Sequence, residues 1–100
     1  MRIVALIGDL MDRSRVSNAI DGVEFATEPS ACAGADVVVI DLARHAAAVA
    51  SVRAAAADAR IVAFGPHVDS ALLEGATRDG ADLVLPRSRF FQDAAAALTG

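Results

Sequence analysis

The chain contains no lysine, tryptophan or tyrosine, and Cys32 is the only cysteine among its 100 residues. A single cysteine excludes an intrachain disulfide and a cysteine-based metal cluster, so we interpret Cys32 as a small, partly buried apolar residue. All nine cationic side chains are arginine, and the net charge is −4. Because nonspecific nucleic-acid binding relies on a basic surface, no nucleic-acid partner is expected.

Long apolar runs are missing as well. No segment approaches the roughly 20 apolar residues of a membrane-spanning helix, so the sequence predicts no membrane association. The first apolar run, residues 3–7, is too short for the core of a signal peptide and is not followed by a plausible cleavage region. We therefore expect a cytoplasmic protein.

Several ligand-binding and catalytic motifs are absent. The sequence has no G-x-G-x-x-G segment after a strand, no Walker loop, no G-x-S-x-G elbow and no Asp-x-His-x-x-Gly motif for cobalamin. A flavodoxin would carry a hydroxyl-rich loop after its first strand, where this chain has residues 8–12, Gly-Asp-Leu-Met-Asp. We therefore expect neither an enzyme activity nor a required cofactor.

Short apolar segments alternate with helical patterns along the whole chain. The segments with strand character are residues 3–7, 23–26, 36–40, 61–64 and 83–85. The helices predicted between and after them are residues 10–20, 29–34, 42–60, 70–80 and 88–98. Asp69 or Ser70 can cap the fourth of these helices, and Ser88 can cap the fifth.

This alternation predicts an α/β fold. Strands separated by helices pair in parallel through right-handed crossovers, and the helices then cover both faces of the sheet. Five strands most simply form a flavodoxin-like sheet in the order 2-1-3-4-5, within a three-layer sandwich. The chain has no linker, repeat or charge block, so residues 1–100 are predicted to form one domain.

Charged residues follow three of the predicted strands. Asp9 follows the first, Asp41 the third and Arg87 the fifth. Ligands of open parallel sheets lie at these carboxyl ends, so a carboxylate facing a guanidinium indicates a possible phosphate site. Structural alternatives remain open, because each aspartate can instead cap the helix that follows it. Arg87 and the nearby Arg89 can hold an anion or be solvated cations, and Arg87 can also pair with Asp41.

The residues at the strand ends resemble those of response regulator receiver domains. Residues 80–87, Gly-Ala-Asp-Leu-Val-Leu-Pro-Arg, resemble the receiver segment that ends in an active-site lysine, and Arg87 stands at the lysine position. Asp41 matches the aspartate that accepts the phosphoryl group. Gly8 and Asp9 match the acidic pair that holds magnesium, with only Asp9 retained. The resemblance implies that Asp9 and Asp41 are candidate Mg²⁺ ligands and that Arg87 is the candidate phosphate cation.

Two departures from the receiver pattern concern its moving parts. Gly65 stands where receivers carry a Thr or Ser hydroxyl, and Val84 stands where they carry an aromatic side chain that swings inward. Our first hypothesis is therefore a stand-alone, degenerate receiver-like domain of bacterial signalling, without a working phosphorylation switch. The second is a Mg²⁺-dependent phosphoacceptor of a two-component phosphorelay, with Asp41 phosphorylated. The third is an anion- or metabolite-binding module that uses Asp9, Asp41, His67 and Arg87.

The resemblance also implies a surface for partners. Receivers usually dock other proteins through their fourth helix, fifth strand and fifth helix. We expect this surface to bind an unidentified signalling protein or a second copy of the chain. Phe90 and Phe91 lie in the fifth helix and point about 100° apart, so one can fill the core while its neighbour stays exposed.

Overall fold

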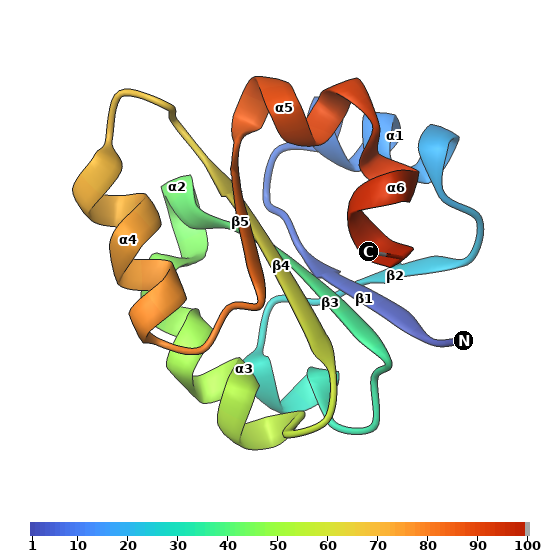
Figure 1. Ribbon diagram of the computed structural model, residues 1–100. Helices are drawn as coiled ribbons and strands as arrows, with labels where there is room; N and C mark the ends of the chain where they lie inside the picture. Colours follow the sequence, from blue (N-terminus) through green and yellow to red (C-terminus); the bar gives the residue numbers. More distant parts are fainter. Residues whose placement is uncertain (100) are drawn as a thin grey trace.

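The computed structural model describes residues 1–99, which form a parallel β-sheet between two helical layers (Figure 1). Its five strands are β1 Ile3–Leu6, β2 Val23–Phe25, β3 Val37–Asp41, β4 Arg60–Gly65 and β5 Leu83–Pro86. The strand order is β2-β1-β3-β4-β5, and every neighbouring pair is parallel. The predicted flavodoxin-like fold and strand order are therefore confirmed.

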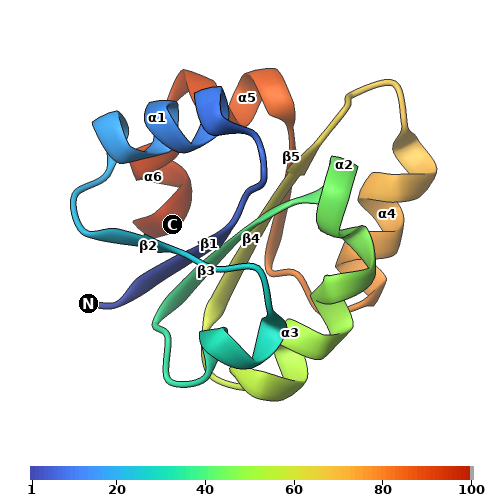
Figure 2. The ribbon, with the colours of Figure 1, turned by 180° about the vertical axis from the view of Figure 1, so that it is seen from behind.

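The helices divide between the two faces of the sheet (Figures 1 and 2). One face is covered by α1 Leu10–Ala19, α5 Arg87–Gln92 and α6 Ala94–Thr99. The other is covered by α2 Leu42–His45, α3 Val49–Ala55, α4 Ser70–Arg78 and two 3₁₀ helices, η1 Pro29–Cys32 and η2 Ala46–Ala48. Among residues 1–99, no helix combines the length and hydropathy needed to cross a membrane.

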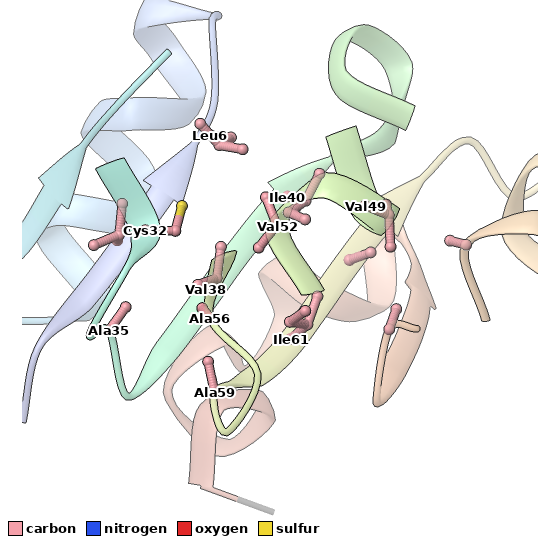
Figure 3. Packing of buried hydrophobic residues seen from close by; sticks show 14 of the residues in the cluster. Leu6, Cys32, Ala35, Val38, Ile40, Val49, Val52, Ala56, Ala59 and Ile61 are labelled. Atoms are coloured by element: carbon pink, nitrogen blue, oxygen red, sulfur yellow. The ribbon is translucent and has the colours of Figure 1, made fainter. Parts of the chain in front are cut away.

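The core lies on both sides of the sheet because successive strand residues point to opposite faces. Val38 and Ile40 of β3 pack toward α3, where they meet Val52 (Figure 3). Val37 and Val39 pack toward the layer of α1, α5 and α6. All five residues of β3 are buried, as expected for a central strand covered on both faces.

The predicted helix over residues 42–60 is wrong in its length and continuity. The structure has α2, then η2, then α3, which ends at Ala55. The backbone leaves helical geometry at His45, with φ −125° and ψ 24°. Leu42 at the start of α2 and Val49 at the start of α3 are both buried and fix these two helices separately. The alanines between them have small side chains that make few contacts to hold one straight helix.

The predicted helix over residues 88–98 is also divided. Asp93, with φ −153°, interrupts it, and its carboxylate accepts a hydrogen bond from Ala96 N at 3.1 Å to cap α6. Ser88 does not cap α5, because this helix begins one residue earlier, directly after Pro86. The fixed φ of proline suits a helix start without a side-chain cap.

Hydrogen bonds fix the start of β5, at the edge of the sheet opposite the carboxyl ends of the strands. Gly80 adopts φ +117°, a conformation that favours glycine, and a Cβ there would lie 3.0 Å from Cγ of Arg53. Arg53 donates two hydrogen bonds to Gly80 O, at 3.0 and 2.7 Å, and one to Asp82 Oδ2 at 2.7 Å. Asp82 Oδ2 also accepts from Ile61 N at 2.8 Å. The Arg53 bonds tie the start of β5 to α3, and the Asp82 bond ties it to β4.

Candidate functional site

Asp9, Asp41 and Arg87 lie at the carboxyl edge of the sheet, where β1, β3 and β5 lead into α1, α2 and α5. Asp9 precedes α1, Asp41 ends β3 and Arg87 begins α5 directly after β5. The parallel arrangement therefore gathers the three predicted site residues on one side of the molecule. Their contacts differ from the pair between Arg87 and Asp41 that was considered from the sequence.

Arg87 pairs with Asp12. Its Nη1 donates to Asp12 Oδ2 at 2.7 Å, and its Nη2 donates to Asp12 Oδ1. The Asp12 side chain is only 4% exposed, whereas that of Arg87 is 43% exposed. The hydrogen bonds and charge of Asp12 raise the pKa of the Arg87 guanidinium. A two-pronged pair of this kind fixes the orientation of the arginine as well as its position.

Asp12 is not among the site residues predicted from the sequence, where Asp41 was the partner considered for Arg87. A signal for Asp12 is nevertheless present. Asp12 follows the cap residue Asp9 by three positions, and residues spaced in this way lie on the same side of a helix. The first turn of α1 therefore presents a second carboxylate at the edge where the strands end.

Aromatic rings support Arg87 from the core. Its guanidinium carbon lies 5.1 Å from the ring centroid of Phe91 and 5.9 Å from that of Phe64. Phe64 stacks on Phe90, with 4.7 Å between the ring centroids. Phe90 is fully buried and fills the core, whereas Phe91 is half-buried and contacts the Arg87 guanidinium through its ring. The Arg15 guanidinium also lies 4.0 Å from the Phe91 centroid.

Asp41 is buried, and no cationic side chain within residues 1–99 pairs with it directly. It is 3% exposed, and its Oδ1 accepts a hydrogen bond from Ala43 N at 3.1 Å, which caps α2. Burial raises the pKa of the Asp41 carboxyl. The charge of Asp12 raises it further, while the Ala43 hydrogen bond and, more weakly, the charge of Arg87 lower it. The capping alternative considered for Asp41 is thus part of its structural role.

The raised pKa of Asp41 predicts that Asp41→Asn stabilises the fold at pH 7. A carboxyl whose pKa is higher in the folded protein contributes stability at low pH and loses it as the pH rises above the usual value of 3.8. Asparagine keeps the helix cap without the buried charge. We expect the free energy of unfolding to rise by about 1 kcal/mol at pH 7, and the gain to shrink near pH 3. Urea denaturation at both pH values measures this, and a loss of stability at pH 7 would refute it.

Asp9 acts as the N-cap of α1. Its Oδ1 accepts from Asp12 N at 3.0 Å, and this hydrogen bond is the main cause of its lowered pKa. The charges of Arg44 and Arg87 lower that pKa further. The stem of Arg44 also covers Gly8, where an added Cβ would lie 3.0 Å from Arg44 Cδ. The position that could carry a second acidic residue is therefore covered by an arginine side chain.

The carboxylates of this edge do not fit a magnesium site. Among residues 1–99, no three His, Cys, Asp or Glu side chains are grouped so that they could hold a metal ion. Magnesium requires oxygen ligands in near-octahedral geometry, and here Arg87 engages both oxygens of Asp12 while one oxygen each of Asp9 and Asp41 caps a helix.

Gly65 is closely packed by two leucines. A Cβ at this position would lie 3.2 Å from Leu73 Cδ2 and 3.3 Å from Leu42 Cβ. Leu42 belongs to α2 and Leu73 to α4, so these helices close over the end of β4. Val84 on β5 is half-buried and packs against the cluster on the same face. The structure thus leaves little room beside Gly65 for the hydroxyl-bearing side chain found in receivers.

The remaining candidates are peripheral to these contacts. His67 is exposed in the loop between β4 and α4, and Ser88 and Arg89 are exposed on α5. His45, at the end of α2, contributes a small lowering of the pKa of Asp41. Cys32 is fully buried, so it is more completely part of the apolar core than the partial burial expected from the sequence.

No protein-family model matches the chain, and no curated protein matches its sequence. Solved structures do match. A response regulator from Burkholderia pseudomallei, with a phosphorylated aspartic acid and a calcium ion, superposes with a TM-score of 0.75 at 18% identity. The match covers 97% of this chain and 65% of that one, so the chain spans less than two thirds of that protein's length.

Two further matches cover nearly the whole of both chains. A CheY-like protein (tadZ) from Pseudomonas aeruginosa gives a TM-score of 0.77 at 20% identity, covering 96% of this chain and 94% of that one. A response regulator from Thermotoga maritima gives 0.75 at 15% identity, covering 99% and 98%. Together with the strand order, these matches show that the chain has the fold of response regulator receiver domains.

Proposed function

We propose that the chain is a degenerate receiver-like signalling domain that acts by binding another protein and has no working phosphorylation switch. The packing around Gly65 carries this proposal. In receivers, a hydroxyl at that position follows the phosphoryl group, and an aromatic side chain on the fifth strand swings inward. Here Leu42 and Leu73 occupy the space beside Gly65, and Val84 has no ring that could rotate.

The pairing of Arg87 gives further support. A phosphoryl group on Asp41 would need a nearby cation, but both ends of the Arg87 guanidinium bind Asp12. Breaking this pair to reach Asp41 would leave Asp12 charged and buried. The pairing of Arg87 with Asp12 also weakens the case for an anion- or metabolite-binding module, because Arg87 is the main candidate cation of such a module. A Mg²⁺-dependent phosphoacceptor at Asp41 is the second candidate, favoured by the position of Asp41 at the end of the central strand β3.

The proposed docking surface consists of α4, β5 and α5. β5 is an edge strand of the sheet, with α4 and α5 beside it (Figure 1). Its residues Leu83–Pro86 are half-buried, so part of their apolar surface is still accessible. An edge of this kind can be covered by another protein or by a second copy of the chain. The proposal assigns the chain no enzyme activity of its own.

Treatment with acetyl phosphate and MgCl₂ tests the absence of a switch. We expect the intact mass to stay unchanged and the amide NMR spectrum to show no movement of β4, α4 or β5. Asp41→Asn is the matched control, since it removes the candidate phosphoacceptor while keeping the α2 cap. A mass gain that Asp41→Asn abolishes, accompanied by shifts across α4 and β5, would show a working phosphoacceptor and overturn the proposal.

A further inference from the structure

Two buried carboxylates lie at the carboxyl edge of the sheet. Asp12 and Asp41 are each 3% exposed, and the pKa of Asp41 is raised mainly by burial and also by the charge of Asp12. Neighbouring buried anions repel each other and lack the solvation that water would give them. A cation beside these carboxylates therefore stabilises the fold.

The protein supplies this cation itself. The Arg87 guanidinium binds both oxygens of Asp12, and the charges of Asp41 and Asp9 also act on it. On its other side it meets the faces of Phe91 and Phe64, at 5.1 and 5.9 Å from the ring centroids. These contacts hold the charge at one place beside the carboxylates, as coordination would hold a metal ion.

A second guanidinium strengthens this arrangement. The Arg44 side chain covers Gly8, and its charge acts on Asp9. The charge of at least one arginine therefore acts on each of the three carboxylates Asp9, Asp12 and Asp41. A divalent ion that used Asp12 as a ligand would have to displace Arg87, and it would meet the positive charges of Arg87 and Arg44.

We propose that Arg87 is a resident cation that takes the place of a divalent metal ion at this site. The protein therefore neither needs nor binds Mg²⁺ there. This inference rests on the proposed function to the extent that a domain without a phosphorylation switch has no need for the metal. The inference also predicts that removing Arg87 creates a metal site. Without Arg87, no cation balances the negative charges of Asp12 and Asp41, and paired carboxylates are suitable ligands for a hard divalent cation.

Thermal unfolding of three proteins tests the inference: the wild type, Arg87→Met and the double variant Asp12→Asn/Arg87→Met. Each is melted in EDTA and in millimolar MgCl₂ or CaCl₂, with ionic strength matched by NaCl. We expect no specific shift for the wild type, a rise in Tm of about 5 °C for Arg87→Met, and no rise for the double variant. A saturable Mg²⁺ shift of the wild type, or an Arg87→Met protein that does not respond, would overturn the inference.

A calorimetric titration of the wild type with MgCl₂ decides the question if Arg87→Met does not fold. Absence of binding supports the resident cation, and saturable binding overturns it. The results of these metal-binding tests can be distinguished from the result of the test of the proposed function. A wild type that binds Mg²⁺ but shows no switch would refute only the resident cation, whereas phosphorylation and spectral change in EDTA would refute only the proposed function.

Discussion

Replacing Arg87 with methionine is expected to lower the free energy of unfolding by about 3 kcal/mol in metal-free buffer. The pair that it breaks is unequal, since the Asp12 side chain is 4% exposed and that of Arg87 43%. The variant therefore leaves a buried carboxylate without its cation, whereas methionine preserves much of the apolar contact of the arginine stem with Phe91. Urea denaturation at pH 7 measures the loss.

A double-mutant cycle shows whether the loss comes from the uncompensated charge. Asp12→Asn in the Arg87→Met background removes that charge, so the double variant should recover part of the lost stability. A surface ion pair would give at most about 1 kcal/mol of coupling, and a buried one should give more. Purely additive effects of the two substitutions would contradict the account of this pair.

Gly65→Thr is expected to cost about 3 kcal/mol. The first atom of the new side chain would lie 3.2 Å from Leu73 Cδ2 and 3.3 Å from Leu42 Cβ, and the remaining atoms would need still more room. Leu42 belongs to the buried cluster on this face and Leu73 packs against it half-buried, so making room would disturb packing next to the core. Chemical denaturation of the variant measures this cost.

Gly75→Ala is the matched control for that substitution. Gly75 lies within α4, and a Cβ there would make only an ordinary contact of 3.7 Å with Arg78 Nη2. Because alanine favours helix over glycine, this variant should be more stable by about 0.5–1 kcal/mol. If Gly65→Thr left stability unchanged, the space beside Gly65 would be open and the main support for a missing relay would be lost.

The sheet could be predicted from the sequence because its signals are local. The apolar runs around Val38 and Val62 are rich in β-branched residues and are separated by helical patterns, which together require a parallel sheet covered on both faces. The same reasoning placed Asp9, Asp41 and Arg87 at one edge, because the carboxyl ends of parallel strands meet there. None of these inferences needs a distance between side chains.

The pairing of Arg87 with Asp12 could not be predicted in this way. The two residues are 75 positions apart, and whether the guanidinium reaches Asp12 or Asp41 depends on how α1 and α5 pack. The helix breaks at His45 and Asp93 escaped prediction for a related reason. Alanine favours helix wherever it occurs, so an alanine-rich segment does not indicate where tertiary contacts interrupt it.

The interpretation of Gly65 gained a physical basis from the structure. The sequence shows only that the hydroxyl expected of a receiver is missing there. The structure adds that Leu42 and Leu73 close the space beside it. A filled space beside Gly65 supports the proposal that the movement guided by this hydroxyl group in receivers is absent.

The central claim is that the receiver fold is present while its switch is absent. The amide NMR spectrum of the wild type, recorded with and without MgCl₂ and the phosphoryl mimic beryllofluoride, tests this most directly. We predict that the amide signals of Gly65, Val84 and α4 keep their positions at saturating concentrations of both reagents. Saturable shifts that spread from Asp41 through Gly65 to α4 and β5, and that disappear in Asp41→Asn, would contradict the claim.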